Sequence, residues 1–206
     1  MSQGDAACAD AMWEAATTVG FFTVTGHGIP EALINDVFDT SETFFAQPIA
    51  DKEAASPFAR EFNSGFEHMT QVRPSTGTTD QKESLQITAR AGAMEGRWPS
   101  YPDKFHPTTY ALMSASRDLA ARILNILEPR ACPTLPKGTL AGAHNLWTDD
   151  SQCTLRLLHY MAMDQKTREA LPEGIWRAGA HTDWDCITLL FQRLGNEGLE
   201  CAPHPK

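Results

Sequence analysis

Two residues that could hold a metal ion stand two positions apart in the segment His181-Thr182-Asp183. Alternate side chains of a β-strand share a face, so an imidazole and a carboxylate at this spacing can bind one metal from the same side. A second histidine from elsewhere would complete a triad of two histidines and one carboxylate, which leaves positions open on iron(II). The alternative is a hydrogen-bonded surface pair that binds no metal.

The sequence around this pair is typical of β-strands. Segments 153–163 and 180–194 are rich in apolar and β-branched residues and are separated by turn-rich linkers. Segment 83–88 alternates weakly, and segment 21–25 is short, aromatic and β-branched, so each is a further strand candidate. Residues 60–80 are rich in Gly, Ser and Thr and are expected to form a long loop.

Helical patterns dominate the first part of the chain. Segment 5–18 is rich in alanine, and a second helix is expected to open at Pro30 and end before Pro48. A short helix should begin near Asp51. Apolar residues recur at helical spacing through segment 108–127 and predict one continuous helix there.

These patterns predict an α+β protein in three parts. Residues 1–128 should form a mostly helical region, residues 129–143 an irregular connector that contains several prolines, and residues 144–206 an incomplete β core. A sheet of two or three strands with one apolar face has little with which to close its own core.

The composition narrows the class of protein. The 206 residues are 42% hydrophobic and 21% charged, as expected for a globular chain, and the formal net charge is −9. This acidity gives no electrostatic basis for binding nucleic acid or an anionic membrane, and no apolar run has the length of a membrane span. The chain has an odd number of cysteines and no leader-like N-terminus, so we expect a soluble, cytoplasmic protein with reduced thiols.

Several motifs occur together and in order, and they connect the metal pair with a known family. They are GFFTVTGHGIP (20–30), DQKESLQI (80–87), LRLLHY (155–160) and HTDWDCITLL (181–190). Together they resemble the isopenicillin N synthase-like family of iron(II)- and 2-oxoglutarate-dependent oxygenases. The resemblance implies that His181 and Asp183 are iron ligands and that Tyr160 contacts 2-oxoglutarate. It also implies helices packed on a double-stranded β-helix, or jelly-roll, and oxidation of a small organic substrate by O2.

The last part of the chain departs from the family pattern. The family has a distal histidine well beyond the carboxylate and, further on, an arginine that binds 2-oxoglutarate, and neither is found in the 206 residues. His204 lies in a proline-bracketed tail and is not expected to be a ligand. We therefore expect a chain that is truncated relative to the family, with two protein ligands, and inactive as it stands.

Two other histidines have expected structural roles, and two alternative functions are considered. His27 is expected to stabilise its glycine-flanked turn, and His159 to point to the face opposite Tyr160 and form a packing or hydrogen-bonding contact. A non-catalytic fragment or interaction protein derived from the family is an alternative function. A metal hydrolase that uses His181 and Asp183 is disfavoured, because no second cluster at ligand spacing and no nucleophile motif accompany the pair.

Overall fold

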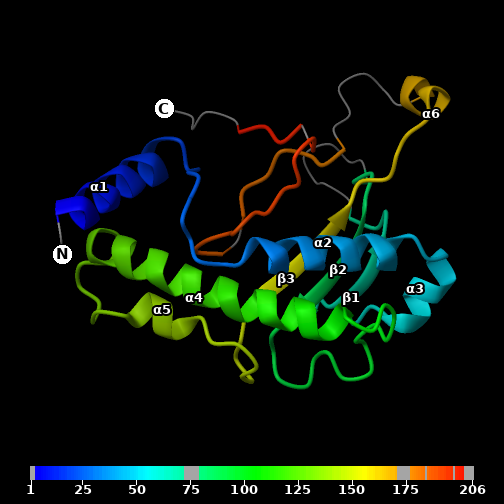
Figure 1. Ribbon diagram of the computed structural model, residues 1–206, viewed down its shortest axis with the longest axis horizontal. Helices are drawn as coiled ribbons and strands as arrows, with labels where there is room; N and C mark the ends of the chain where they lie inside the picture. The colour runs from blue at the N-terminus through cyan, green and yellow to red at the C-terminus, as the bar shows by residue number, and fades with distance from the viewer. Residues whose placement is uncertain (1–2, 72–78, 171–176, 184, 197, 202–206) are drawn as a thin grey trace.

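The computed structural model describes residues 3–71, 79–170, 177–183, 185–196 and 198–201 (Figure 1). In this part of the chain, helices pack on one three-stranded antiparallel sheet. The helices are α1 (Gln3–Thr18), α2 (Glu31–Phe45), α3 (Ile49–Ala55), α4 (Phe105–Ala131), α5 (Thr139–Ala143) and α6 (Gln165–Ala170). The strands are β1 (Gly65–His68), β2 (Glu83–Thr88) and β3 (Thr154–His159), in the order β1-β2-β3.

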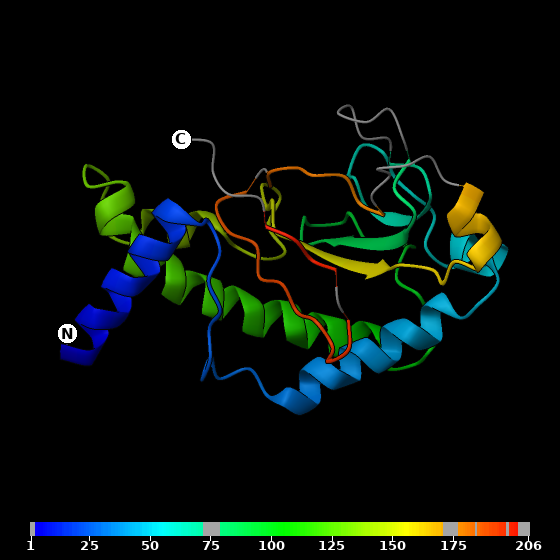
Figure 2. The ribbon, with the colours of Figure 1, turned by 90° about the horizontal axis from the view of Figure 1, so that it is seen from above.

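The register of the sheet gives it two different faces. Phe66, Leu85 and Leu157 are paired across the three strands, and all three are buried. This apolar face packs on α2 and α4, which lie on the same side of the sheet (Figure 2). On the opposite face the side chains of β3 are exposed. The chain from residue 177 begins on that side and then runs to α2, where Arg193 forms ion pairs with Asp39 and Glu42 (Figure 2).

The helix predictions are confirmed. The predicted helix over 108–127 lies within α4, which is longer by a few residues at each end. Its apolar stripe faces the core, where Leu112, Leu119 and Ile123 are buried. Pro30 is the N-cap of α2, as expected for a residue whose missing N–H would have no partner there. Among the described helices, none combines the length and the apolar character needed to cross a membrane.

The strand predictions are confirmed only where two segments pair. Segment 83–88 is β2 and segment 153–163 contains β3, whereas 21–25 is extended without a ladder. The described part of 180–194 also forms no strand, because it is not paired by ladder hydrogen bonds with another described segment. Its side chains still alternate, and three of them pack against the core: Ile187, Leu189 and Phe191.

Two elements form where the sequence predicted irregular chain. β1 lies inside the predicted loop, where Gly65 has a φ of 111° and passes so close to Pro57 that a Cβ would lie 2.5 Å from the Pro57 oxygen. α5 lies inside the predicted connector. Its first turn is held by buried Glu128, which accepts hydrogen bonds from the N–H groups of Leu140 and Gly138, and these bonds lower the pKa of that carboxyl.

Candidate functional site

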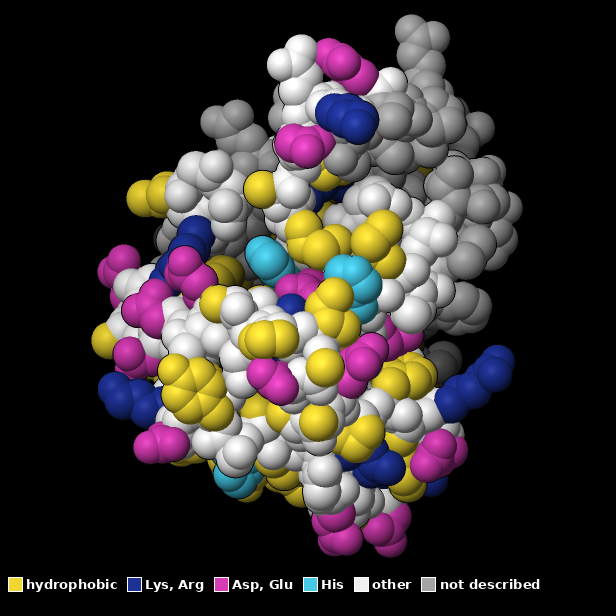
Figure 3. Space-filling model, turned by 90° about the vertical axis from the view of Figure 1, so that its right-hand side faces the viewer, with side chains coloured by type: hydrophobic (Ala, Val, Ile, Leu, Met, Phe, Trp, Pro, Cys, Tyr) yellow, Lys and Arg dark blue, Asp and Glu magenta, His cyan; other side chains and the backbone are white. Residues whose placement is uncertain are grey.

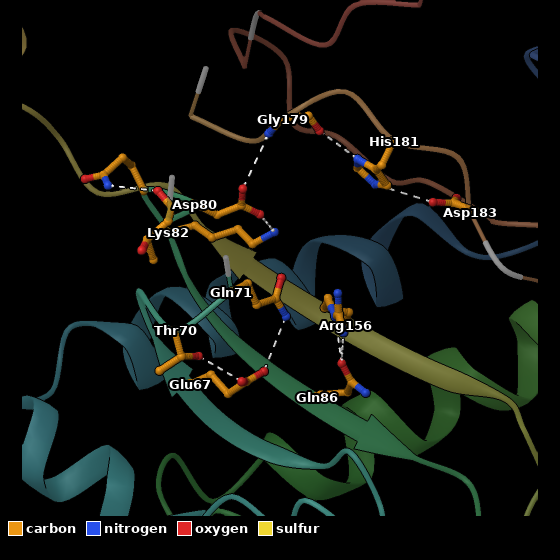
Figure 4. Close-up of polar contacts among 12 residues, drawn as sticks. Glu67, Thr70, Gln71, Asp80, Lys82, Gln86, Arg156, Gly179, His181 and Asp183 are labelled. Carbon is orange, nitrogen blue, oxygen red and sulfur yellow. Dashed lines mark hydrogen bonds and ion pairs between the residues drawn. The ribbon is translucent and has the colours of Figure 1, made fainter. Parts of the chain in front are cut away.

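His181 and Asp183 lie beside each other on the side of the sheet opposite α2 and α4, which we call the open side (Figure 4). His181 Nε2 is 3.5 Å from Asp183 Oδ1, and both side chains are about half exposed. His181 Nδ1 is 2.8 Å from the carbonyl oxygen of Gly179. Because a carbonyl can only accept, Nδ1 carries the proton, and Nε2 presents its lone pair when the imidazole is neutral.

The other atoms of the pair are also held by the protein. Asp183 Oδ2 accepts a hydrogen bond of 2.6 Å from the hydroxyl of Thr188. Nε2 and Oδ1 therefore face each other as two electron-rich atoms, an arrangement that a cation between them would stabilise. At metal–ligand bond lengths of about 2.1 Å, two ligands at right angles lie roughly 3.0 Å apart. The two donors consequently fit a divalent metal after a small adjustment.

The structure brings together two of the three expected ligands, one histidine and one carboxylate. In the described ranges, no group of three His, Cys, Asp or Glu side chains is arranged to hold a metal ion. His204, which the sequence disfavoured as a ligand, lies outside those ranges. The pair is carried by an extended segment and not by a paired strand, so strand alternation is not what aligns the two side chains.

Tyr160 contacts the segment that carries His181. It follows the last residue of β3, and the guanidinium carbon of Arg177 lies 5.4 Å from the centre of its ring. Arg177 also donates a hydrogen bond to the carbonyl of Met161, and its own carbonyl accepts one from the backbone N–H of Gln81 at 2.9 Å. The end of β3 and the start of β2 thus both hold the chain just before His181.

Arg156 is a residue of this face that the sequence reasoning did not select. Its Nε donates to Oε1 of Gln86 on the neighbouring strand at 2.7 Å. It rises from β3 on the side of the sheet where His181 and Asp183 lie (Figure 4). Strand alternation could have identified Arg156 from the sequence. It lies four residues before Tyr160, on the strand that Tyr160 extends, so the two side chains share a face.

The two remaining histidine predictions are confirmed. His27 Nδ1 accepts a hydrogen bond of 3.1 Å from the backbone N–H of Ile29 and so closes its own turn. His159 belongs to the opposite face of β3 from Arg156, where its Nδ1 lies 2.8 Å from Oε1 of Glu83.

Glu83 is the centre of a buried charge cluster on the helix-facing side of the sheet. Its oxygens lie 2.7 and 2.8 Å from Lys52 Nζ, and His68 Nδ1 lies 3.4 Å away. Burial alone would raise the pKa of Glu83, but hydrogen bonds from Lys52 and His159 and the charge of Lys52 outweigh it, and the net pKa is lowered. Figure 3 shows histidine side chains next to acidic and basic side chains on this face of the molecule.

A family model matches the chain over residues 1–109, just over half of its 206 residues. Its description is non-haem dioxygenase in morphine synthesis, N-terminal. The chain belongs to the family of non-haem dioxygenases that depend on iron(II) and 2-oxoglutarate. Iron(II) is the metal of this family and 2-oxoglutarate its co-substrate.

Relatives and solved structures agree with this assignment. The 2-oxoglutarate-Fe(II) type oxidoreductase hxnY of Emericella nidulans is 34% identical over 189 residues, which cover 84% of this chain and 52% of the relative. Homoarginine-6-hydroxylase 2-ODD-C23 of Glycine max is 27% identical over 87% of this chain and 56% of its own. A full-length protein of Neurospora crassa, solved in complex with alpha-KG, has a TM-score of 0.66 and 25% identity, over 85% of this chain and 55% of that one. The chain thus spans about half the length of the curated relatives it matches.

Proposed function

We propose that His181 and Asp183 are two of the iron(II) ligands of a 2-oxoglutarate-dependent dioxygenase and that Tyr160 contacts the 2-oxoglutarate. The observation that carries the proposal is that His181 Nε2 and Asp183 Oδ1 face each other. The remaining polar atoms, Nδ1 of His181 and Oδ2 of Asp183, are already hydrogen-bonded within the protein. Bound iron would supply the coupling of 2-oxoglutarate decarboxylation to oxidation of a small organic substrate by O2.

The residues around the pair suit this role. The Gly179 carbonyl fixes the tautomer of His181 that offers Nε2, and Thr188 leaves Oδ1 of Asp183 for the metal. Arg156 adds a positive charge on the same side of the sheet, which suits an anionic or carbonyl group of a bound molecule.

We further propose that the chain binds metal weakly and is inactive as it stands. The described residues supply two protein ligands, where a facial triad has three. Each ligand that is missing weakens binding, and two groups alone do not fix the positions that O2 and 2-oxoglutarate require.

The test combines metal binding with turnover. Calorimetric titration with Co²⁺ should give an affinity that falls at least tenfold in His181→Ala and in Asp183→Ala, while His144→Ala, which removes an imidazole after α5, keeps it. With iron(II), ascorbate and 2-oxoglutarate, no sustained succinate should form. Equal metal affinity in all four proteins would refute the site. Sustained succinate formation that His181→Ala abolishes would refute the inactivity.

A further inference from the structure

A second buried ion pair lies at the start of β2, on the side of the proposed metal pair. The side chains of Asp80 and Lys82 are 2% and 5% exposed, and Asp80 Oδ2 lies 2.8 Å from Lys82 Nζ. Removing two charges from water is costly, and their mutual attraction offsets that cost only when the geometry is good. This pair therefore fixes one carboxylate oxygen of Asp80 firmly in place.

The other oxygen of Asp80 faces the segment that leads to His181. Oδ1 accepts a hydrogen bond of 3.4 Å from the backbone N–H of Gly179, a contact that is buried (Figure 4). One residue after Asp80, the N–H of Gln81 donates to the Arg177 carbonyl at 2.9 Å. Since segment 177–183 has no strand partner in the described chain, these contacts attach it to the sheet together with those of Arg177 at the end of β3.

Gly179 connects this anchor with the metal ligand. Its N–H is held by Asp80, and its carbonyl accepts the Nδ1–H of His181 at 2.8 Å. A displacement of Gly179 would move the acceptor away from Nδ1 and release the tautomer that presents Nε2 toward Asp183. The path from Lys82 through Asp80 and Gly179 to His181 is thus a continuous series of hydrogen bonds (Figure 4).

We propose that Asp80 is a positioning residue for His181: through Gly179 it fixes the ring and tautomer of the imidazole for metal binding. The inference rests on the proposed function for its metal. The geometry it assigns to His181 exists in the metal-free protein and can be measured there. Groups that orient metal ligands typically change metal affinity by about 10–100-fold when they are removed, and we expect about tenfold for Asp80.

The first test needs no metal and no variant. In alkaline buffer, long-range ¹H–¹⁵N spectra of the neutral imidazole should show His181 protonated at Nδ1. The Gly179 amide should exchange with deuterium more slowly than an amide of an open chain. A proton on Nε2, or unprotected exchange at Gly179, would overturn the proposal.

The second test uses variants of two buried carboxylates. Asp80→Ala should give a mixture of His181 tautomers, faster Gly179 exchange and about tenfold weaker Co²⁺ binding. Asp80→Asn, which keeps an acceptor oxygen, should retain more of the Nδ1–H tautomer. Glu83→Gln alters an equally buried carboxylate on the opposite face of the sheet and should leave the tautomer unchanged. If folded Asp80→Ala keeps the His181 tautomer and the Gly179 exchange rate of the wild type, the positioning role of Asp80 is refuted. If His181→Ala binds Co²⁺ as tightly as the wild type, only the proposed function is refuted.

Discussion

At the scale of single residues, the Lys52–Glu83 pair is a buried contact whose loss should be costly. The Lys52 ammonium also donates to the Phe45 carbonyl at 2.9 Å and lies 5.1 Å from the centre of the Phe66 ring. Its charge is therefore satisfied by groups from α2, β1 and β2. Removing one partner of such a pair leaves an uncompensated charge in the core.

We expect Lys52→Met to lower the free energy of unfolding by about 3–5 kcal/mol at neutral pH, because Glu83 stays buried without its cation. Since the pKa of Glu83 is lower in the folded than in the unfolded protein, its stabilising contribution is complete above about pH 4.3 and is lost as the pH falls through the folded value. The difference between variant and wild type should therefore shrink in acid.

Urea unfolding at neutral pH and in acid measures both effects. Lys104→Met removes an exposed ammonium and should stay within about 0.5 kcal/mol of wild type throughout. A difference between Lys52→Met and wild type that grows as the pH falls would contradict the assigned role of the pair.

At the scale of elements, β3 shows how one strand separates the core from the proposed site. Leu157 is 9% exposed and belongs to the apolar cluster, while its neighbour Leu158 is 41% exposed. Strand alternation places the two side chains on opposite faces of the sheet. Burial along β3 thus follows the helix-facing side, and the other side carries Arg156.

This asymmetry predicts very different costs for the same substitution at adjacent positions. Leu157→Ala should lower the free energy of unfolding by about 2–5 kcal/mol, because it leaves a cavity against α2 and α4. Leu158→Ala should cost about 0.5 kcal/mol or less. Chemical denaturation of the two variants measures both values, and equal losses would mean that the open face of β3 is covered.

At the scale of the whole molecule, exposed leucines follow one another along the last described segments of the chain. Leu190, Leu194 and Leu199 are all more than half exposed. β3 lies at one edge of the sheet, where unpaired backbone groups can join another chain. Arg193 forms ion pairs with Asp39 and Glu42 of α2, so the exposed leucines are presented by an anchored segment.

We therefore expect the chain to self-associate as its concentration rises, because association would bury these leucines. The double variant Leu190→Glu, Leu194→Glu should remain monomeric over a wider range in light scattering after size exclusion. Leu135→Glu changes an exposed leucine beyond the end of α4 and should behave as wild type. A wild-type chain that is monomeric at every concentration would contradict the expectation.

The sequence by itself determined the elements whose signals are local. The helical repeat that gave α4, the proline that opens α2 and the alternation that gave β2 depend on neighbours a few residues apart. The spacing of His181 and Asp183, together with the ordered motifs, also predicted the family and a pair of candidate ligands. Each of these signals can be read from one short segment.

Only the tertiary structure decided what depends on contacts between distant segments. Segment 180–194 has strand-like composition but forms no described strand, because a strand requires a partner and composition does not supply one. The closeness of Nε2 and Oδ1 comes instead from the Gly179 and Thr188 hydrogen bonds. The attachment of that segment to Asp80 joins residues 99 positions apart, a separation at which no local pattern carries information.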